Sequence, residues 1–261
     1  MDYLKEDSCH ASTKHHVAFQ EYGKMRDALD ATGRAFFFSL CGWNDWYAPE
    51  GKDLGNAWRI GPDDTNWDGV LKNIDINANL SAYAGPGIGW NDPCLLLAED
   101  ETGVQRITEA QSRFQFSMWA VMASPLLISG DIRNMSSRNV ETYTNRKVIA
   151  INQDSLGKQG TRIVGSDLSS KNTTNIWAKP LSDGFAAIAF LNVGPNATDV
   201  KCDADCLSSI LPEQSKEKMV VCAYDLWNDT RETVALVYQL IAYQVPPNGG
   251  VTLFRLGPCV E

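Results

Sequence analysis

The sequence predicts an α/β part with a parallel sheet, followed by an all-β part that is most simply an antiparallel sandwich. Up to about residue 155, apolar runs typical of buried strands alternate with segments of helical periodicity. After residue 160, strand-like stretches follow one another and are separated by turn signals such as Asp183-Gly184. The length of 261 residues suits one barrel or two ordinary domains. We therefore predict domains over residues 1–158 and 159–261.

The elements of the α/β part are predicted from periodicity and from apolar runs. The apolar residues Ala18, Tyr22, Met25 and Leu29 recur every three or four positions, which predicts a helix that Gly33 stops. The run "AFFFSL" is continuously apolar, as expected for a strand buried on both faces. In chain order we expect a strand at 3–7, a helix at 15–34, a strand at 35–40, a loop at 41–66, a helix from 67, a strand within 83–97, a helix at 104–123, a strand at 124–130 and a helix at 139–152.

The all-β part is predicted from five stretches rich in β-branched and aromatic residues. They are "NIWAKPL" (175–181), "FAAIAFLNV" (185–193), "KMVVCAYDLW" (218–227), "ETVALVYQLIAYQVPP" (232–247) and "GGVTLFRL" (249–256).

Charge and motifs exclude several classes of function. The formal net charge of −9 disfavours a nucleic-acid partner, because an acidic chain repels phosphates. No apolar stretch approaches the roughly 20 residues that span a bilayer, so no membrane partner is expected. Nucleotide-binding, serine-hydrolase and zinc fingerprints are absent, and the three histidines all lie within residues 10–16. We therefore expect no cofactor and no metal.

The cysteines and sequons favour the secretory route. The spacing Cys202-Asp-Ala-Asp-Cys206 suits a small disulfide loop, although half of a metal site has the same spacing. The pairing of the other cysteines (Cys9, Cys41, Cys94, Cys222 and Cys259) stays open. Five Asn-x-Ser/Thr sequons, at Asn79, Asn134, Asn172, Asn196 and Asn228, point to a secreted or lysosomal/vacuolar protein. Since no signal peptide is visible, a segment before Met1 is expected.

Polar residues follow the predicted strands at their carboxyl ends, where parallel barrels place active sites. They are Lys5, Asp7, Cys41, Trp43, Asn44, Arg59, Asp63, Asp64, Trp90, Asn91, Asp92, Asp131 and Arg133. Two converging carboxylates, with cations and a tryptophan nearby, suit glycoside hydrolysis by a nucleophile and a general acid. The alternative is that Asp7 and Asp63 cap helices or form surface ion pairs.

At these residues the sequence resembles glycoside hydrolase family 27, the α-galactosidase and α-N-acetylgalactosaminidase family. "YLKEDSC" is similar to the family's "YLKYDNC" nucleophile motif. The likeness continues in family order through "FFSLCGW", "WRIGPD", "YAGPGIGWNDP", "MWAVMASPLLISGDIR", "VIAINQDSLGKQG", "CDADC" and "VPPNGGVTLFRL". The resemblance implies a (β/α)8 barrel followed by a β-sandwich. It also implies that this chain carries about strands 4–8 and lacks the first three.

The resemblance assigns roles to individual residues. Asp7 matches the nucleophile, and Asp63 matches the acid/base, with the adjacent Asp64 as a rival. The residues that match or lie near sugar-binding positions are Lys5, Cys9, Cys41, Trp43, Arg59 and Asp92. In the family, the counterpart of Cys9 pairs with a cysteine on an earlier strand.

Two departures from the family affect the expected specificity. Gly42 stands where the family often has Glu, which predicts a 2-position pocket that is roomier, or more polar through water. Cys94 replaces the second Asp of "WNDPD", which removes one carboxylate near the sugar.

We expect a retaining exo-glycosidase acting on terminal α-D-galactosyl residues of oligosaccharides or glycolipids. The carbohydrate substrate is the expected partner, and a homodimer is left open. Three alternatives remain: an α-N-acetylgalactosaminidase, a β-L-arabinopyranosidase, and an inactive truncated fragment or pseudoenzyme.

Overall fold

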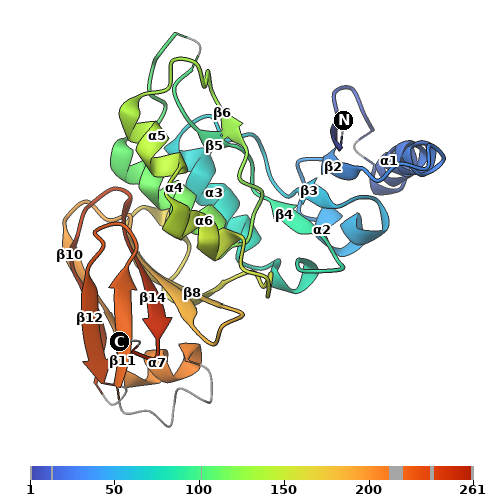
Figure 1. The fold of residues 1–261 in the computed structure, drawn as a ribbon. Helices are drawn as coiled ribbons and strands as arrows, with labels where there is room; N and C mark the ends of the chain where they lie inside the picture. The colour runs from blue at the N-terminus through green and yellow to red at the C-terminus, as the bar shows by residue number, and fades with distance from the viewer. Residues whose placement is uncertain (1, 13, 101, 212–219, 236–237, 260–261) are drawn as a thin grey trace.

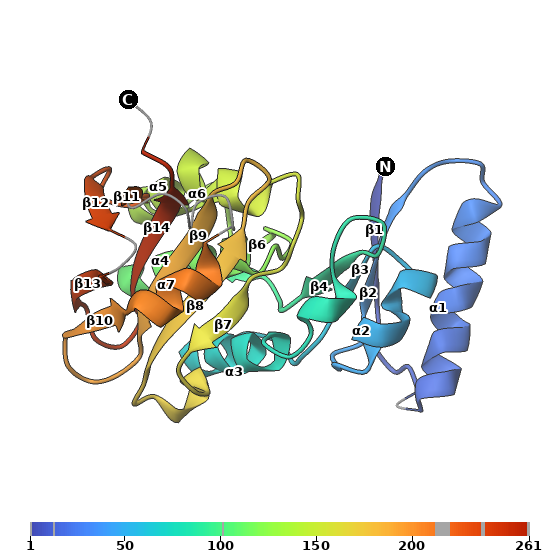
Figure 2. The same cartoon turned by 90° about the horizontal axis from the view of Figure 1, so that it is seen from below.

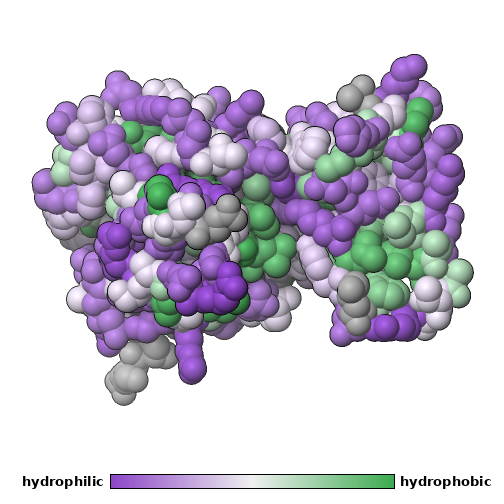
Figure 3. Space-filling model, turned by 90° about the horizontal axis from the view of Figure 1, so that it is seen from above, coloured by the Kyte–Doolittle hydropathy of each residue, from purple (hydrophilic) through white to green (hydrophobic). Residues whose placement is uncertain are grey.

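The computed structural model describes residues 2–12, 14–100, 102–211, 220–235 and 238–259, with the side chains of Thr233 and Ala235 excepted. The chain forms a smaller N-terminal lobe and a larger lobe, joined through β4 (Trp90–Asp92) and the segments beside it (Figures 1 and 2). The face drawn in Figure 3 is mostly hydrophilic, with hydrophobic patches on both lobes. Within the described residues, no helix has the length and apolar character needed to cross a bilayer.

A four-stranded parallel sheet, in the order β1-β2-β3-β4, forms the smaller lobe. Its elements are β1 (Tyr3–Asp7), α1 (His15–Asp30), β2 (Phe37–Cys41), α2 (Tyr47–Glu50), the 3-10 turn η1 (Gly51–Asp53), β3 (Ala57–Arg59) and β4 (Trp90–Asp92). The predicted loop over residues 41–66 is wrong in part, because it contains α2 and β3. Three residues of strand are too few to show an alternating pattern.

The α/β part continues in the larger lobe, where β5 pairs in parallel with β6. Its elements are α3 (Trp67–Asn77), η2 (Ser81–Tyr83), β5 (Leu96–Leu97), α4 (Glu109–Val121), β6 (Ile128–Ser129), α5 (Ser137–Tyr143) and α6 (Arg146–Asn152). The strand predicted within 83–97 divides at Pro93-Cys94 into β4 and β5, so this segment links the two parallel sheets. The predicted helix 139–152 is two helices, because the Asn145 side chain caps α6 by accepting from Lys147 N and Val148 N.

The all-β part consists of a six-stranded sheet and a two-stranded sheet. The order β12-β11-β14-β9-β8-β7 is antiparallel throughout, and β10 pairs antiparallel with β13. The elements are β7 (Thr161–Val164), η3 (Leu168–Ser170), β8 (Thr174–Pro180), β9 (Ala186–Asn192), β10 (Thr198–Cys202), α7 (Ala204–Ile210), β11 (Val220–Asp225), β12 (Arg231–Ala235), β13 (Leu240–Val245) and β14 (Gly250–Gly257).

The predicted strand 232–247 is instead two strands, β12 and β13, which lie in different sheets. Residues 236–237 of that prediction, and 218–219 of the strand predicted at 218–227, lie outside the described residues.

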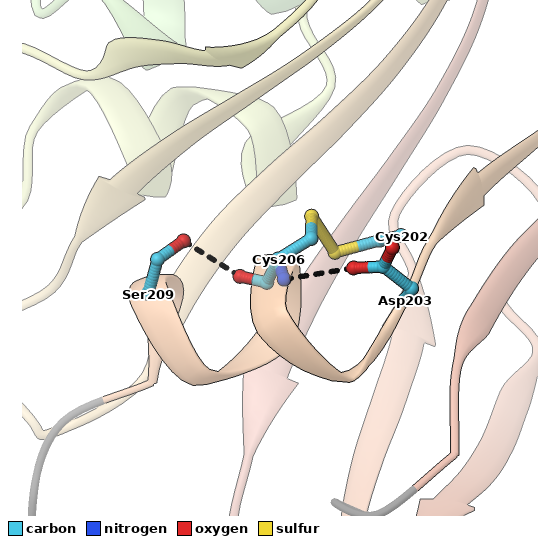
Figure 4. The surroundings of a disulfide bond; sticks show 4 residues. All are labelled: Cys202, Asp203, Cys206 and Ser209. Carbon is cyan, nitrogen blue, oxygen red and sulfur yellow. Dashed lines mark hydrogen bonds between the residues drawn. A yellow bond between two sulfur atoms is a disulfide. The ribbon is translucent and has the colours of Figure 1, made fainter.

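Two disulfides cross-link the sandwich. Cys202 and Cys206 are joined at the start of α7, where Asp203 accepts a hydrogen bond from Cys206 N at 3.0 Å and Ser209 donates to Cys206 O at 2.7 Å (Figure 4). This is the disulfide that the spacing predicts. Cys222 on β11 pairs with Cys259, beyond the end of β14. The thiols of Cys9, Cys41 and Cys94 are free.

The hydrophobic cores do not follow the two halves of the sequence. One core contains Trp119 from α4 together with Trp177, Leu191 and Leu253 from the sandwich. A second core lies within the sandwich, and a third lies in the smaller lobe. Lys179 on β8 is fully buried and donates to Ile151 O at 2.6 Å at the end of α6. The helices α4 and α6 therefore pack as one body with the sandwich.

Candidate active site

Four residues lie in one row at the carboxyl ends of the parallel strands β1 to β4: Asp7, Cys41, Arg59 and Asp92. Asp7 is paired with Cys41, and Arg59 is paired with Asp92. Cys41 and Arg59 are level because the residues just before them, Leu40 and Trp58, are paired. Residues in register point to the same face of a sheet, so these four side chains share one face.

Lys5 lies on the same face of β1 as Asp7, two positions earlier. Its ammonium group is 3.9 Å from Asp92 Oδ2, across the sheet. Asp92 is 1% exposed, and its Oδ1 accepts from Cys94 N at 2.9 Å. Among the described residues, Asp92 Oδ2 and Arg59 Nε are buried without a hydrogen-bond partner. The face therefore holds an acceptor and a donor with unused hydrogen-bonding capacity.

Burial raises the pKa of the Cys41 thiol to about 11. The cations of Lys5 and Arg59 oppose this rise, and the carboxylates of Asp7 and Asp92 add to it. Cys41 therefore stays a neutral thiol at physiological pH and is not a nucleophile.

Arg59 joins the row to the loop that follows β3. Its guanidinium group is buried, and Nη2 donates to Asp63 Oδ1 at 2.9 Å and to Gly61 O at 3.2 Å. The side chain of Asp63 is 63% exposed. This contact holds a solvent-accessible carboxylate in the loop directly after β3.

Asp64, the neighbour of Asp63, is buried instead. Its Oδ1 accepts from Asn73 Nδ2 at 2.6 Å, and its backbone N–H donates to Cys94 Sγ at 3.3 Å. Burial raises the pKa of the Asp64 carboxyl to about 8, against the opposing effects of Arg59 and of the bond from Asn73. Asp64 is therefore a neutral, inward-facing acid at neutral pH and below.

Of the eight residues to which the resemblance assigns a catalytic or sugar-binding role, the structure brings six together and leaves two apart. Asp7, Cys41, Arg59 and Asp92 form the row, Lys5 contacts Asp92, and Asp63 contacts Arg59. Two candidates lie beyond the strand ends. Cys9 is exposed after β1, and Trp43 is 38% exposed after β2 with a positive φ of 58°.

The expectation of extra space at Gly42 is wrong. A Cβ atom there would lie 1.7 Å from Cε2 of Tyr47, so the Tyr47 ring already occupies that position. The ring packs against Trp46, with centroids 4.1 Å apart, and edge-on to Phe19 and Tyr22.

Sequence reasoning missed Asn73. This residue is fully buried on α3 and contacts the loops after both β3 and β4. Its only signal in the sequence is a polar residue among the apolar positions Val70, Leu71 and Ile74.

Comparisons with known proteins match both parts of the chain. A family model described as "Alpha galactosidase A" matches residues 1–154, and one described as "Alpha galactosidase C-terminal beta sandwich domain" matches residues 171–256. "Alpha-galactosidase 3" of Arabidopsis thaliana is 42% identical over 196 residues, which cover 74% of this chain and 42% of that protein. "Alpha-galactosidase A" of Cellvibrio japonicus is 34% identical over 277 residues, covering 99% of this chain and 64% of that protein.

A solved α-galactosidase structure also matches nearly the whole chain. An α-galactosidase structure from Saccharomyces cerevisiae superposes with a TM-score of 0.83 at 25% identity, covering 99% of this chain and 73% of that one. This chain spans less than two thirds of the length of the two curated relatives named above. The fold is accordingly part of a β/α barrel followed by an antiparallel β-sandwich. The chain belongs to the α-galactosidase family, glycoside hydrolase family 27.

Proposed function

We propose that this chain supplies the catalytic carboxylates of a retaining exo-glycosidase that removes terminal α-D-galactosyl residues from oligosaccharides or glycolipids. The observation that carries the proposal is a difference in solvent exposure among the four aspartates near the carboxyl ends of β1 to β4. Asp7 and Asp63 are exposed, whereas Asp64 and Asp92 are buried. The two exposed carboxylates are those that match the nucleophile and the acid/base.

In the first step, Asp7 attacks the anomeric carbon and forms a glycosyl ester, while Asp63 gives its proton to the departing oxygen. In the second step, Asp63 removes a proton from water, and that water displaces Asp7 with net retention of configuration. This double displacement requires the carboxyl groups to stand about 5–5.5 Å apart in the working site. Because Asp63 must begin protonated and Asp7 ionised, we expect an acidic pH optimum.

The buried polar groups of the row suit a sugar. Asp92 Oδ2 and Arg59 Nε make no hydrogen bond within the described part of the chain. We assign sugar hydroxyls as their partners, and because both atoms are buried, these side chains must move to meet the substrate. Lys5 offers a further donor beside Asp92. We assign Cys41, Trp43 and Cys9 to the rim of the same site, with Trp43 as an exposed apolar platform for a sugar ring.

The cellular setting is part of the proposal. Five sequons and two disulfides favour the secretory route, and hence a secreted or lysosomal/vacuolar location. We keep the domain division at residues 158/159. A homodimer is the oligomeric state to test, by light scattering of the purified protein.

The test is turnover of a chromogenic α-galactoside, with the released sugar followed by NMR. The proposal expects α-galactose as the first product, and no turnover for Asp7→Ala in a protein with an unchanged circular dichroism spectrum. Initial release of β-galactose, or near-normal activity of Asp7→Ala, would contradict the mechanism. A folded wild type that turns over no galactoside would favour the inactive alternative. Faster turnover of the N-acetylgalactosaminide or β-L-arabinopyranoside would reassign the sugar.

A further inference from the structure

Asn73 makes three contacts with its side-chain amide, in a place where the sequence pattern expects an apolar residue. Its Nδ2 atom lies 2.8 Å from Pro62 O, 2.6 Å from Asp64 Oδ1 and 2.9 Å from Pro93 O. An amide group has two protons, so one of these three contacts must share a proton with another. The side chain is fully buried, where each lost hydrogen bond is costly.

The three acceptors belong to residues that adjoin Asp63 and Asp92 in the chain. Pro62 and Asp64 are the residues on either side of Asp63 in the chain, and Pro93 directly follows Asp92 at the end of β4. Asn73 therefore holds the Pro62 carbonyl and the Asp64 side chain, on either side of Asp63, and ties this loop to the neighbouring strand end.

The loop is closely fitted to this amide. A Cβ atom at Gly61 would lie 2.1 Å from Asn73 Oδ1, so only glycine leaves room for the amide at that point. On the other side, Asp64 N donates to Cys94 Sγ at 3.3 Å. Between these anchors, Asp63 is the residue whose carboxylate turns outward to Arg59.

We propose that Asn73 is a positioning residue for Asp63, holding the loop of residues 61–64 so that the Asp63 carboxyl faces the leaving group of the substrate. This inference rests on the proposed role of Asp63 as the acid/base. Asn73 itself touches neither the substrate nor the reacting atoms, and it acts through the Pro62 carbonyl and the Asp64 carboxyl.

A defect in proton donation has a distinctive kinetic effect. A sugar or alkyl leaving group needs a proton as its bond to the anomeric carbon breaks, whereas fluoride or a dinitrophenolate leaves without one. A misplaced acid therefore slows the first class of substrate and spares the second. General destabilisation of the protein lowers the rates of both classes together.

The experiment compares kcat/KM for methyl α-galactoside and for α-galactosyl fluoride in the wild type, Asn73→Ala and Asp63→Ala. The matched control is Asn77→Ala, one turn further along α3. Asn77 is also fully buried, but its amide donates to Met122 Sδ at 3.3 Å, away from the loop. Thermal melting of each variant measures the loss of stability separately.

We expect Asn73→Ala to lower kcat/KM for the methyl glycoside about 10- to 100-fold, because small misplacements of catalytic groups cost this much. The fluoride should change less than about threefold, and Asn77→Ala should change the ratio of the two rates little. If Asp63→Ala shifts the ratio but Asn73→Ala does not, the positioning role is wrong. If Asp63→Ala leaves the ratio unchanged, or the wild type is inactive, the proposed function fails first.

Discussion

Replacing Asp64 by asparagine should change how the stability of the protein depends on pH. The amide has the shape of the acid, and its oxygen can still accept the bond from Asn73 Nδ2, which is 2.6 Å long in the wild type. The side chain is 5% exposed, and burial raises the pKa of this carboxyl to about 8. The substitution therefore removes a buried titrating group while it preserves the packing.

The direction in which the unfolding free energy changes with pH follows from the protonation of Asp64 in the folded and unfolded chains. Between pH 4 and pH 8 the folded protein keeps the Asp64 proton, and the unfolded chain releases it. The stabilisation that this proton gives is complete below about pH 4 and is lost as the pH rises through 8. Between pH 5 and pH 8 the wild type should lose about 3 to 4 kcal/mol of unfolding free energy relative to Asp64→Asn.

The assay is urea unfolding of both proteins at pH 5, 6, 7 and 8. A matched control is Asp68→Asn, on the first turn of α3, whose side chain is 65% exposed in a surface ion pair with Lys171. That pair contributes little in water, so the control curve should run nearly parallel to the wild type. Parallel curves for the wild type and Asp64→Asn would refute the buried, neutral state of Asp64.

Four further substitutions test the packing and the cross-links. Gly42→Ala should cost about 1 to 3 kcal/mol in urea unfolding, since its Cβ would overlap the confined Tyr47 ring. Gly23→Ala, within α1 and with no atom closer than 3.8 Å, should stabilise by about 1 kcal/mol; similar losses in both variants would contradict this account. Cys202→Ser should cost about 2 kcal/mol and Cys222→Ser about 4, because their disulfides close loops with sequence separations of 4 and 37; the reverse order would contradict the loop-entropy argument.

The order of strands and helices is largely predictable from local patterns. The run "AFFFSL" marks β2 because its residues are apolar on both faces, and the four-three-four spacing marks α1. The points at which one predicted helix or strand divides into two were harder to predict. Polar Asn145 caps α6 inside a continuous helical pattern, and Pro93-Cys94 splits one apolar stretch between two sheets.

The residue types of the site could be predicted from the sequence, but which of its side chains face the solvent could not. Asp63 and Asp64 are adjacent and chemically alike, so nothing local tells which one faces the solvent. That choice depends on Asn73 and Cys94, which reach the loop from a helix and from the next strand end. The filling of the Gly42 position by Tyr47 is likewise a tertiary contact that single-sequence patterns do not contain.

The most direct measurement of the central claim is the trapping of the covalent intermediate. The wild-type protein is incubated with a fluorinated α-galactosyl fluoride that forms the glycosyl-enzyme faster than water hydrolyses it, and the digested protein is mapped by mass spectrometry. The anomeric fluoride leaves, and we predict one fluorogalactosyl label, attached to Asp7. A label on a different carboxylate, or steady turnover of this reagent through inversion, would contradict the assignment of Asp7 as the nucleophile.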